Sequence, residues 1–269
     1  MNNNEIKCVD ILSTMIENDG LIGIKTSFED EGALFNDIVK LKTVCSNAKT
    51  PITLKIGGPE AIRDLKESII LGVDGVVAPM IESVFGLHKF LNAVKNNITP
   101  KDIEALHLNI NIETITAVNS IDDILDFVDI HMLSGITIGR VDLVSSMGKD
   151  REYVNDEEIY NIVKRIFTKV KDKKLKACIG GAVSIDSYNF LERLNSEGLL
   201  DKFETRYAMY DPNIALKNFG RALYNGQLFE YEWLMNKRNY YLTFANQDNN
   251  RIQMIENRIS KSQSNSSLL

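Results

Sequence analysis

Short apolar runs rich in β-branched residues alternate along the chain with longer segments whose apolar residues recur every three or four positions. The short runs predict buried strands, and the longer periodic segments predict helices. Regular alternation of the two is typical of βα units around a parallel sheet in an α/β fold. The predicted strands lie at 20–28, 51–58, 75–81, 106–113, 135–142, 175–181 and 203–210.

A closed (β/α) barrel and an open, doubly wound sheet both produce this alternation. We expect the barrel. The 269 residues fit one such barrel, which commonly takes about 250 residues as a single domain. The seven predicted strands are one fewer than the standard eight. Either residues 6–12 supply the missing strand, or the barrel closes in a different way.

After Pro212 the pattern changes to a long, mixed helical stretch with many aromatic residues. Residues 213–259 are therefore predicted as a C-terminal helical extension of a barrel domain that spans residues 5–212. Such an extension packs on the barrel or on a neighbouring subunit, and we expect a homo-oligomer. The Asn-rich residues 1–4 and the polar tail at 260–269 are predicted to be disordered.

The composition narrows the range of partners. The net charge of −6 and the pI near 5.3 argue against a nucleic-acid partner, which would favour a basic patch. The three cysteines form no CxxC pair, which favours a reducing compartment and gives no zinc signature. No run approaches the roughly 18 apolar residues of a membrane span, and no apolar signal segment opens the chain. These features predict a cytoplasmic protein that does not bind a membrane.

Two acidic residues end neighbouring predicted strands. Glu113 ends LHLNINIE and Asp142 ends GITIGRVD, and adjacent strands lie about 4.8 Å apart. In a parallel barrel both carboxylates would reach the same mouth, where they repel each other unless a cation lies between them. Mg²⁺ is commonly held by one or two carboxylates plus waters and substrate oxygens, and it can polarise a carbonyl. The alternative is that each acid caps the helix that follows it.

Basic residues also lie near predicted strand ends. Lys55 is followed by Gly57, Gly58 and a proline, and a glycine turn that opens a helix offers backbone N–H groups to an anion. Lys25 lies late in the first strand, and a lysine inside a barrel is rare unless it is paired. It begins the segment KTSFEDEG, which places Glu29 near the rim.

Alternation along a strand predicts two further arrangements. Arg140 precedes Asp142 by two positions, so both side chains would share a face and Arg140 could bind a substrate carboxylate. The same spacing predicts a buried pair between Glu204 and Arg206. None of the three histidines is expected at the upper mouth of the barrel. His88 lies on an outer helix, and His107 and His131 lie at the lower ends of predicted strands. Proton transfer there must use Lys, Asp, Glu or a metal-bound water.

The stretches GVDGVVAPMIES, LNINIET and GITIGRVDLVSSMG resemble the HpcH/HpaI aldolase and citrate lyase beta-subunit family of the phosphoenolpyruvate/pyruvate superfamily, over about residues 20–210. The resemblance implies a modified TIM barrel, Mg²⁺ or Mn²⁺, and a C–C bond made or broken beside a 2-oxo acid or acyl-CoA. It matches the two metal carboxylates of the family to Glu113 and Asp142. The substrate-carboxylate arginine of the family falls at Lys55, which cannot form a bidentate fork.

The aldolase branch carries an acidic–His pair where this chain reads SFEDEG, without histidine. Either Glu29 or Glu31 replaces that pair, or the proton takes a different route altogether. The resemblance therefore implies a metal-dependent carbon–carbon lyase or aldolase that acts on a pyruvate- or oxaloacetate-like 2-oxo acid through a metal-stabilised enolate. The expected catalytic residues are Lys25, Glu29, Lys55 and Arg140, and the expected substrate-binding residues are Lys55, Gly57, Gly58, Pro79 and Arg140. Two alternatives stay open: a phosphoenolpyruvate-using mutase or condensing enzyme, and a non-catalytic barrel subunit.

Overall fold

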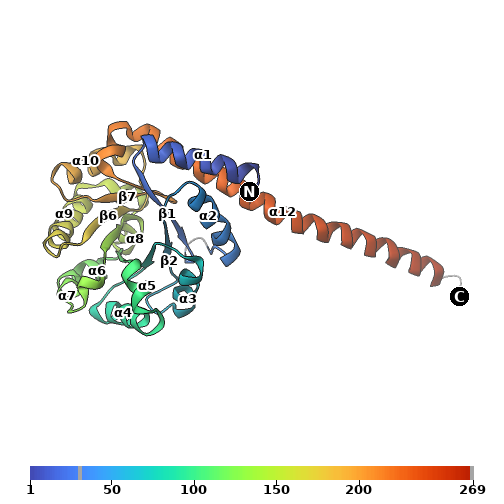
Figure 1. The fold of residues 1–269 in the computed structure, drawn as a ribbon, viewed down its shortest axis with the longest axis horizontal. Helices are drawn as coiled ribbons and strands as arrows, with labels where there is room; N and C mark the ends of the chain where they lie inside the picture. The colour runs from blue at the N-terminus through green and yellow to red at the C-terminus, as the bar shows by residue number, and fades with distance from the viewer. Residues whose placement is uncertain (30–31, 267–269) are drawn as a thin grey trace.

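The computed structural model describes residues 1–29 and 32–266, the last three of these by their backbone alone. Eight strands form a closed barrel in chain order (Figure 1). The strands are β1 (Leu21–Ser27), β2 (Ile52–Lys55), β3 (Gly75–Ala78), β4 (His107–Ile112), β5 (Gly135–Gly139), β6 (Lys176–Gly180), β7 (Lys202–Glu204) and β8 (Ala208–Tyr210). The expected barrel is confirmed.

The barrel closes through an antiparallel hairpin. Strands β1 to β7 pair in parallel, whereas β8 is antiparallel to both β7 and β1. The segment 203–210, predicted as one strand, is therefore two short strands joined by a turn, in which Thr205 N donates to Ala208 O at 2.9 Å. Residues 6–12 do not supply the eighth strand, because they lie within the helix α1 (Asn3–Asn18).

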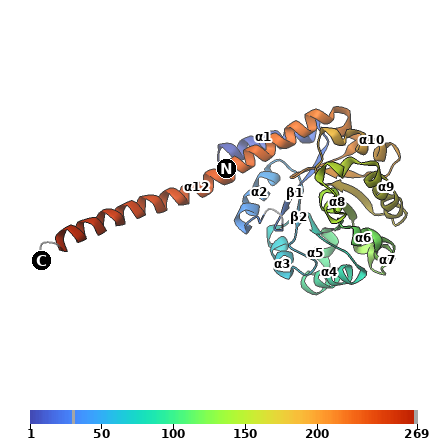
Figure 2. The ribbon, with the colours of Figure 1, turned by 180° about the vertical axis from the view of Figure 1, so that it is seen from behind.

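Helices surround the barrel and bury the apolar outer face of the strands (Figures 1 and 2). The longer ones are α2 (Phe35–Asn47), α3 (Ile62–Leu71), α4 (Val84–Asn97), α9 (Glu157–Asp172), α10 (Tyr188–Ser196) and α12 (Phe219–Ser266). The shorter ones are α5 (Pro100–Ala105), α6 (Ile115–Asn119), α7 (Ile121–Leu125), α8 (Arg140–Ser146) and α11 (Pro212–Ala215). Single 3₁₀ turns are η1 (Ile130–Met132), η2 (Arg151–Asn155), η3 (Ile185–Ser187) and η4 (Leu216–Asn218).

Helix α9 shows why these segments are helical. Asp156 caps its first turn by accepting from Glu158 N at 2.9 Å, and acidic residues at the start and lysines at the end suit the helix dipole. Ile159, Val163 and Ile166 recur every three or four positions and are fully buried against the barrel.

The N-terminal helix α1 packs beside the first part of α12 along one side of the barrel (Figures 1 and 2). Asn2 caps α1 and donates to Asn236 Oδ1 at 2.7 Å. Asp19, which is 1% exposed, accepts from Arg221 Nε and Asn225 Nδ2, both at 2.6 Å. Residues 1–4 are therefore ordered in the structure, contrary to the composition-based prediction. Helix α12 also continues through residues 260–266 of the predicted disordered tail, and residues 267–269 lie outside the described residues.

The outer part of α12 projects away from the barrel, and every described side chain from 242 to 263 is exposed (Figure 2). Ile252, Ile255 and Ile259 are 52%, 41% and 52% exposed, and their spacing places them on one side of the helix. A helix in a protein is stabilised mostly by packing of its apolar face. The apolar face of this segment packs against no described residue of its own chain. None of the described helices, α12 included, combines the length and the hydropathy needed to cross a bilayer.

We predict that α12 pairs with a second copy of the chain through this isoleucine face. Light scattering of the full chain should then give a multiple of 30.4 kDa. The combined substitution I252S, I255S and I259S should lower that mass, because it removes the apolar contact. Substitution of Gln253 and Asn257 by serine on the same helix serves as the control and should leave the mass unchanged. A monomeric mass for the unsubstituted chain would contradict the prediction.

Candidate active site

The carboxyl ends of β1 to β7 meet at one mouth of the barrel, and charged residues gather there. Lys55 is the last residue of β2, and Glu113 directly follows β4. Asp142 lies in the first turn of α8, which directly follows β5. Since β4 and β5 pair in parallel, with Ile112 opposite Ile138, these two acids leave neighbouring strands on the same side of the barrel.

Among the acids that the structure describes at this mouth, Glu113 is the best buried. It is 2% exposed, and alternation along β4 places it on the inward face with Asn109 and Asn111. Its Oε1 accepts from Met80 N at 3.0 Å, and its Oε2 accepts from Asn111 Nδ2 at 3.0 Å. The carboxylate is therefore fixed from two directions before any ligand arrives.

The backbone around this carboxylate is shaped to admit it. Met80 adopts a φ of 52°, a left-handed conformation that costs a non-glycine residue about 1 kcal/mol or more. That conformation aims the Met80 N–H at Glu113. The buried Pro79 directly before Met80 has a fixed φ, which restricts the backbone at this point. A side chain at Gly139 would begin 2.6 Å from Glu113 Oε2, so it would displace the Glu113 carboxylate. Pro79, expected to bind substrate, thus lies next to a residue that supports the acid.

Burial raises the pKa of Glu113, while Lys55 and the hydrogen bonds from Met80 and Asn111 oppose the rise. Asp142 contributes to the rise by its negative charge. The two acids predicted as a pair are therefore within electrostatic reach of each other, with one buried and the other exposed. Asp142 also occupies a first-turn position of α8 that favours an acid, but it makes no capping hydrogen bond with the described residues. The helix after Glu113 is capped by Thr114, so Glu113 does not cap it.

Two lysines at this mouth are held by glutamates. Lys55 Nζ lies 2.8 Å from Glu29 Oε2, and Lys25 Nζ lies 2.5 Å from Glu204 Oε1. Burial alone would lower the pKa of Lys25, but the charge and hydrogen bond of Glu204 outweigh it and raise that pKa. Glu204 therefore pairs with Lys25, whereas Arg206, its predicted partner, is exposed in the turn between β7 and β8. Glu31, the other expected replacement for the acidic–His pair, lies outside the described residues.

Arg140 does not face the mouth. Strand β5 ends at Gly139, so Arg140 begins α8 and the strand alternation that predicted its direction no longer applies. The side chain is 0% exposed and lies over the Phe190 ring, 4.8 Å from the ring centre. Its five hydrogen bonds run to the backbone oxygens of Val154, Gly180 and Gly181 and to side-chain oxygens of Asn155 and Ser187. This guanidinium joins loops together instead of presenting donors to a substrate.

The glycine turn after β2 also differs from the prediction. Helix α3 begins at Ile62, not at Pro59, and Gly57 N donates to Asp64 Oδ2 at 2.7 Å. The Gly57 N–H is therefore already engaged, and Gly57 and Gly58 do not open a helix that could hold an anion. Lys55 alone remains from that predicted anion site.

The histidines lie where the sequence predicted, away from this mouth. His107 begins β4, His131 lies in η1, and His88 bonds to Asn92 on the outer helix α4. Sequence reasoning missed two members of the site, Asn111 and Glu204. The alternation of Asn109, Asn111 and Glu113 with isoleucines signals the first. The spacing correctly predicted that Glu204 is buried but not that it belongs to this site, because its partner Lys25 lies 179 positions away and no local signal identifies it.

The donor set allows a divalent cation without forming a complete cage. No group of three or more His, Cys, Asp or Glu side chains converges as a metal site within the part of the chain that the structure describes. Two carboxylates are nevertheless enough for Mg²⁺, which takes its remaining ligands from water and substrate. Asn111 Oδ1 is buried and accepts no hydrogen bond from the described residues, so an oxygen acceptor is left over beside Glu113. The chemistry of these donors fits a hard, oxygen-seeking cation.

The chain is a (β/α)-barrel protein with charged residues gathered at the carboxyl mouth. In barrel enzymes this mouth carries the active site, so the arrangement is typical of an enzyme. The sequence profile of the HpcH/HpaI aldolase/citrate lyase family matches residues 48–191. The chain belongs to this family, which implies a function of the lyase or aldolase type. Comparison with curated protein sequences finds no match.

Solved structures share the fold at low sequence identity. An HpcH/HpaI aldolase from Desulfitobacterium hafniense DCB-2 matches with a TM-score of 0.60 and 16% identity over 73% of this chain and 81% of that chain. The citrate synthase SbnG matches with a TM-score of 0.61 and 16% identity over 83% and 89%. A family member from Burkholderia cenocepacia J2315 matches with a TM-score of 0.61 and 10% identity over 89% of each chain. These likenesses establish the modified TIM barrel.

We predict that Arg140 supports stability. The substitution R140K should lower the free energy of unfolding by about 3 kcal/mol, because lysine cannot replace a planar fork that satisfies several buried acceptors. Thermal melting of R140K against the unsubstituted protein measures the effect. R165K, at an exposed arginine of α9, serves as the control and should melt like the unsubstituted protein. An unchanged melting temperature for R140K would contradict the structural role.

Proposed function

We propose that the protein is a carbon–carbon lyase or aldolase that acts on a small 2-oxo acid with the help of Mg²⁺ or Mn²⁺. One observation carries the proposal: a buried carboxylate, Glu113, is fixed by Met80 N and Asn111 Nδ2 at a mouth where Asp142 and Lys55 act on its charge. An acid buried in this way is unstable in its ionised form unless positive charge is supplied. A cation between Glu113 and Asp142 would supply it.

When bound, such a cation would polarise the keto oxygen of the substrate and stabilise the negative charge that develops on that oxygen. Glu113 would be a rigid ligand, since both of its oxygens already accept hydrogen bonds. Asp142 would be a mobile one, since it is exposed on α8. Oxygen donors of the substrate would complete the coordination.

Lys55 is the residue proposed to attract the substrate carboxylate. Its side chain is largely buried, and its Nζ lies 2.8 Å from Glu29 Oε2. A lysine acts as a point charge and accepts several carboxylate orientations, whereas an arginine fork fixes one. Glu29 would orient Lys55 and move aside as the substrate carboxylate binds.

Lys25 is the residue proposed to stabilise negative charge that develops on the substrate. Glu204 raises the pKa of Lys25 and so holds it in its charged form. A lysine with a raised pKa gives up its proton poorly near neutral pH, so its ammonium acts as a fixed positive charge. The two lysines lie near enough for the charge of Lys55 to oppose protonation of Lys25, so both charges lie beside the proposed substrate carboxylate site.

We predict that Mg²⁺ raises the melting temperature of the protein, because a ligand that binds only the folded form stabilises it by mass action. The rise should grow with pH across the range above the ordinary glutamate pKa, because burial raises the pKa of Glu113 and the cation needs its ionised form. E113Q should lose the rise, and E152Q, at an exposed glutamate, should keep it. An equal Mg²⁺ effect in E113Q would place the cation elsewhere.

We further predict that the protein, with Mg²⁺, exchanges the C3 protons of pyruvate for deuterium in D₂O, which proton NMR detects. This exchange reports proton transfer at the carbon beside the keto group and needs no second substrate. E113Q should reduce the exchange rate about 100-fold or more, since even outer partners of metal ligands cost 10–100-fold. E152Q again serves as the matched control.

Two results would favour the alternatives. Release of inorganic phosphate from phosphoenolpyruvate, without exchange on pyruvate, would favour a condensing enzyme. An Mg²⁺-dependent rise in melting temperature without any exchange or phosphate release would favour a non-catalytic barrel subunit. Either result would contradict the lyase proposal.

A further inference from the structure

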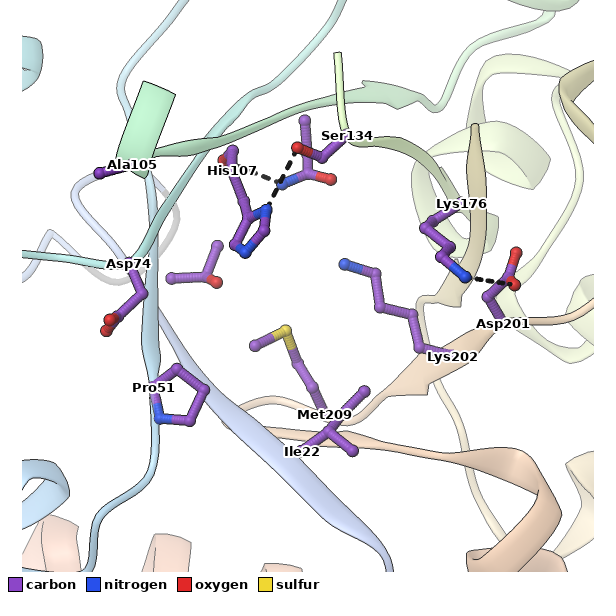
Figure 3. Close-up of a pocket in the computed structure, with 12 residues that line it drawn as sticks. Ile22, Pro51, Asp74, Ala105, His107, Ser134, Lys176, Asp201, Lys202 and Met209 are labelled. Carbon is purple, nitrogen blue, oxygen red and sulfur yellow. Dashed lines mark hydrogen bonds and ion pairs between the residues drawn. The ribbon is translucent and has the colours of Figure 1, made fainter. Parts of the chain in front are cut away.

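A cavity of about 470 Å³ opens at the opposite mouth of the barrel (Figure 3). Its lining comes from the amino ends of the strands, where His107, Lys176 and Lys202 are the first residues of β4, β6 and β7. Glu113 and Lys55 lie at the other ends of their strands, so this cavity is separate from the candidate active site. Its volume falls within the range of small-molecule sites.

The lining acids are already neutralised. Asp74 accepts from Lys42 Nζ at 3.1 Å and from Ile52 N at 2.9 Å. Asp201 lies 2.8 Å from Lys171 Nζ and 3.3 Å from Lys176 Nζ, and it also accepts from Ala177 N at 2.8 Å. Both carboxylates are thus balanced by lysines and by backbone N–H groups, and neither leaves net negative charge in the cavity.

Lys202 supplies the remaining positive charge. Its side chain is half-buried and points into the centre of the cavity (Figure 3). It makes no ion pair or hydrogen bond with any residue that the structure describes. Across the cavity, the His107 ring lies 3.3 Å from Ser134 Oγ through Nδ1, so a hydroxyl and an imidazole face the same space. These groups can donate hydrogen bonds to one anionic group.

The opposite wall is apolar. Ile22, Pro51 and Met209 line it, and Figure 3 shows Ile22 and Met209 together across from His107. Ile22 is 42% exposed although it lies in a barrel strand, which leaves an apolar surface facing the cavity. A ligand that matches both walls has a charged end and an apolar body.

We propose that this cavity binds a small organic anion, with its carboxylate at Lys202, His107 and Ser134 and its apolar body against Ile22, Pro51 and Met209. The site is independent of the proposed lyase function. It takes its ligand without a metal, because both lining acids are already paired.

Titration calorimetry with benzoate tests the proposal. Benzoate should bind with a stoichiometry of one per chain, with and without Mg²⁺ and equally in E113Q. K202Q should weaken the binding about tenfold or more, because it removes a charge-assisted hydrogen bond. K173Q, which removes an exposed lysine paired with Asp126 on the outer surface, should bind like the unsubstituted protein. Lys202 has no structural partner among the described residues, so K202Q should fold normally.

Ligand analogues separate the two walls. Benzyl alcohol, which lacks the charge, and inorganic phosphate, which lacks the apolar body, should each bind more weakly than benzoate. I22N should weaken benzoate without affecting phosphate. Absence of benzoate binding, equal affinity in K202Q, or loss of binding in E113Q would overturn the proposal, and the last result would move the anion to the carboxyl mouth. If Mg²⁺ does not bind at Glu113, the results expected for benzoate at this cavity stay the same.

Discussion

The arrangement at the carboxyl mouth depends on the burial of one charge, the carboxylate of Glu113. Transfer of an ionised carboxyl from water into a protein interior is costly unless it is paired or hydrogen-bonded. Three groups offset that cost. The strained backbone at Met80 and the side-chain amide of Asn111 donate hydrogen bonds to the carboxylate, and the nearby Lys55 supplies positive charge. The chain also leaves position 139 without a side chain. Each of these features serves this one carboxylate, and such local strain around a buried charge is typical of functional sites.

The interior of the barrel is polar, as the groups that surround the Glu113 carboxylate require. Standard barrels fill this space with layers of branched apolar side chains. Here the buried inward positions include Lys55, Asn109, Asn111, Glu113, Thr137 and Glu204, while Ile110, Ile112, Ile136 and Ile138 face the helices and carry the apolar packing. Packing therefore comes mainly from the layer between strands and helices. Both mouths carry charged groups, the upper one around Glu113 and the lower one at Lys202 beside an apolar wall.

Much of this could be predicted from the sequence, because periodicity reports which face of each element is buried. Six parallel strands lie where the pattern predicted them, and the end of the fourth predicted strand placed Glu113 at the carboxyl mouth. The eighth strand could not be predicted, because two three-residue strands around a turn have the same composition as one longer strand. The Lys25–Glu204 pair joins positions far apart in the chain, and no local pattern encodes it.

Arg140 shows how a boundary of one residue changes a functional interpretation. Had β5 continued to Asp142, Arg140 would have faced the mouth as a substrate arginine. The strand ends at Gly139 instead, and the guanidinium turns into the loops after β5 and β6. Gly181, with a φ of 80°, leaves room for this turn, since a side chain there would begin 2.7 Å from Arg140 N. Arg140 therefore fixes the start of α8, and with it the position of Asp142. An arginine that touches no substrate can in this way determine how far apart the two acids of the site lie.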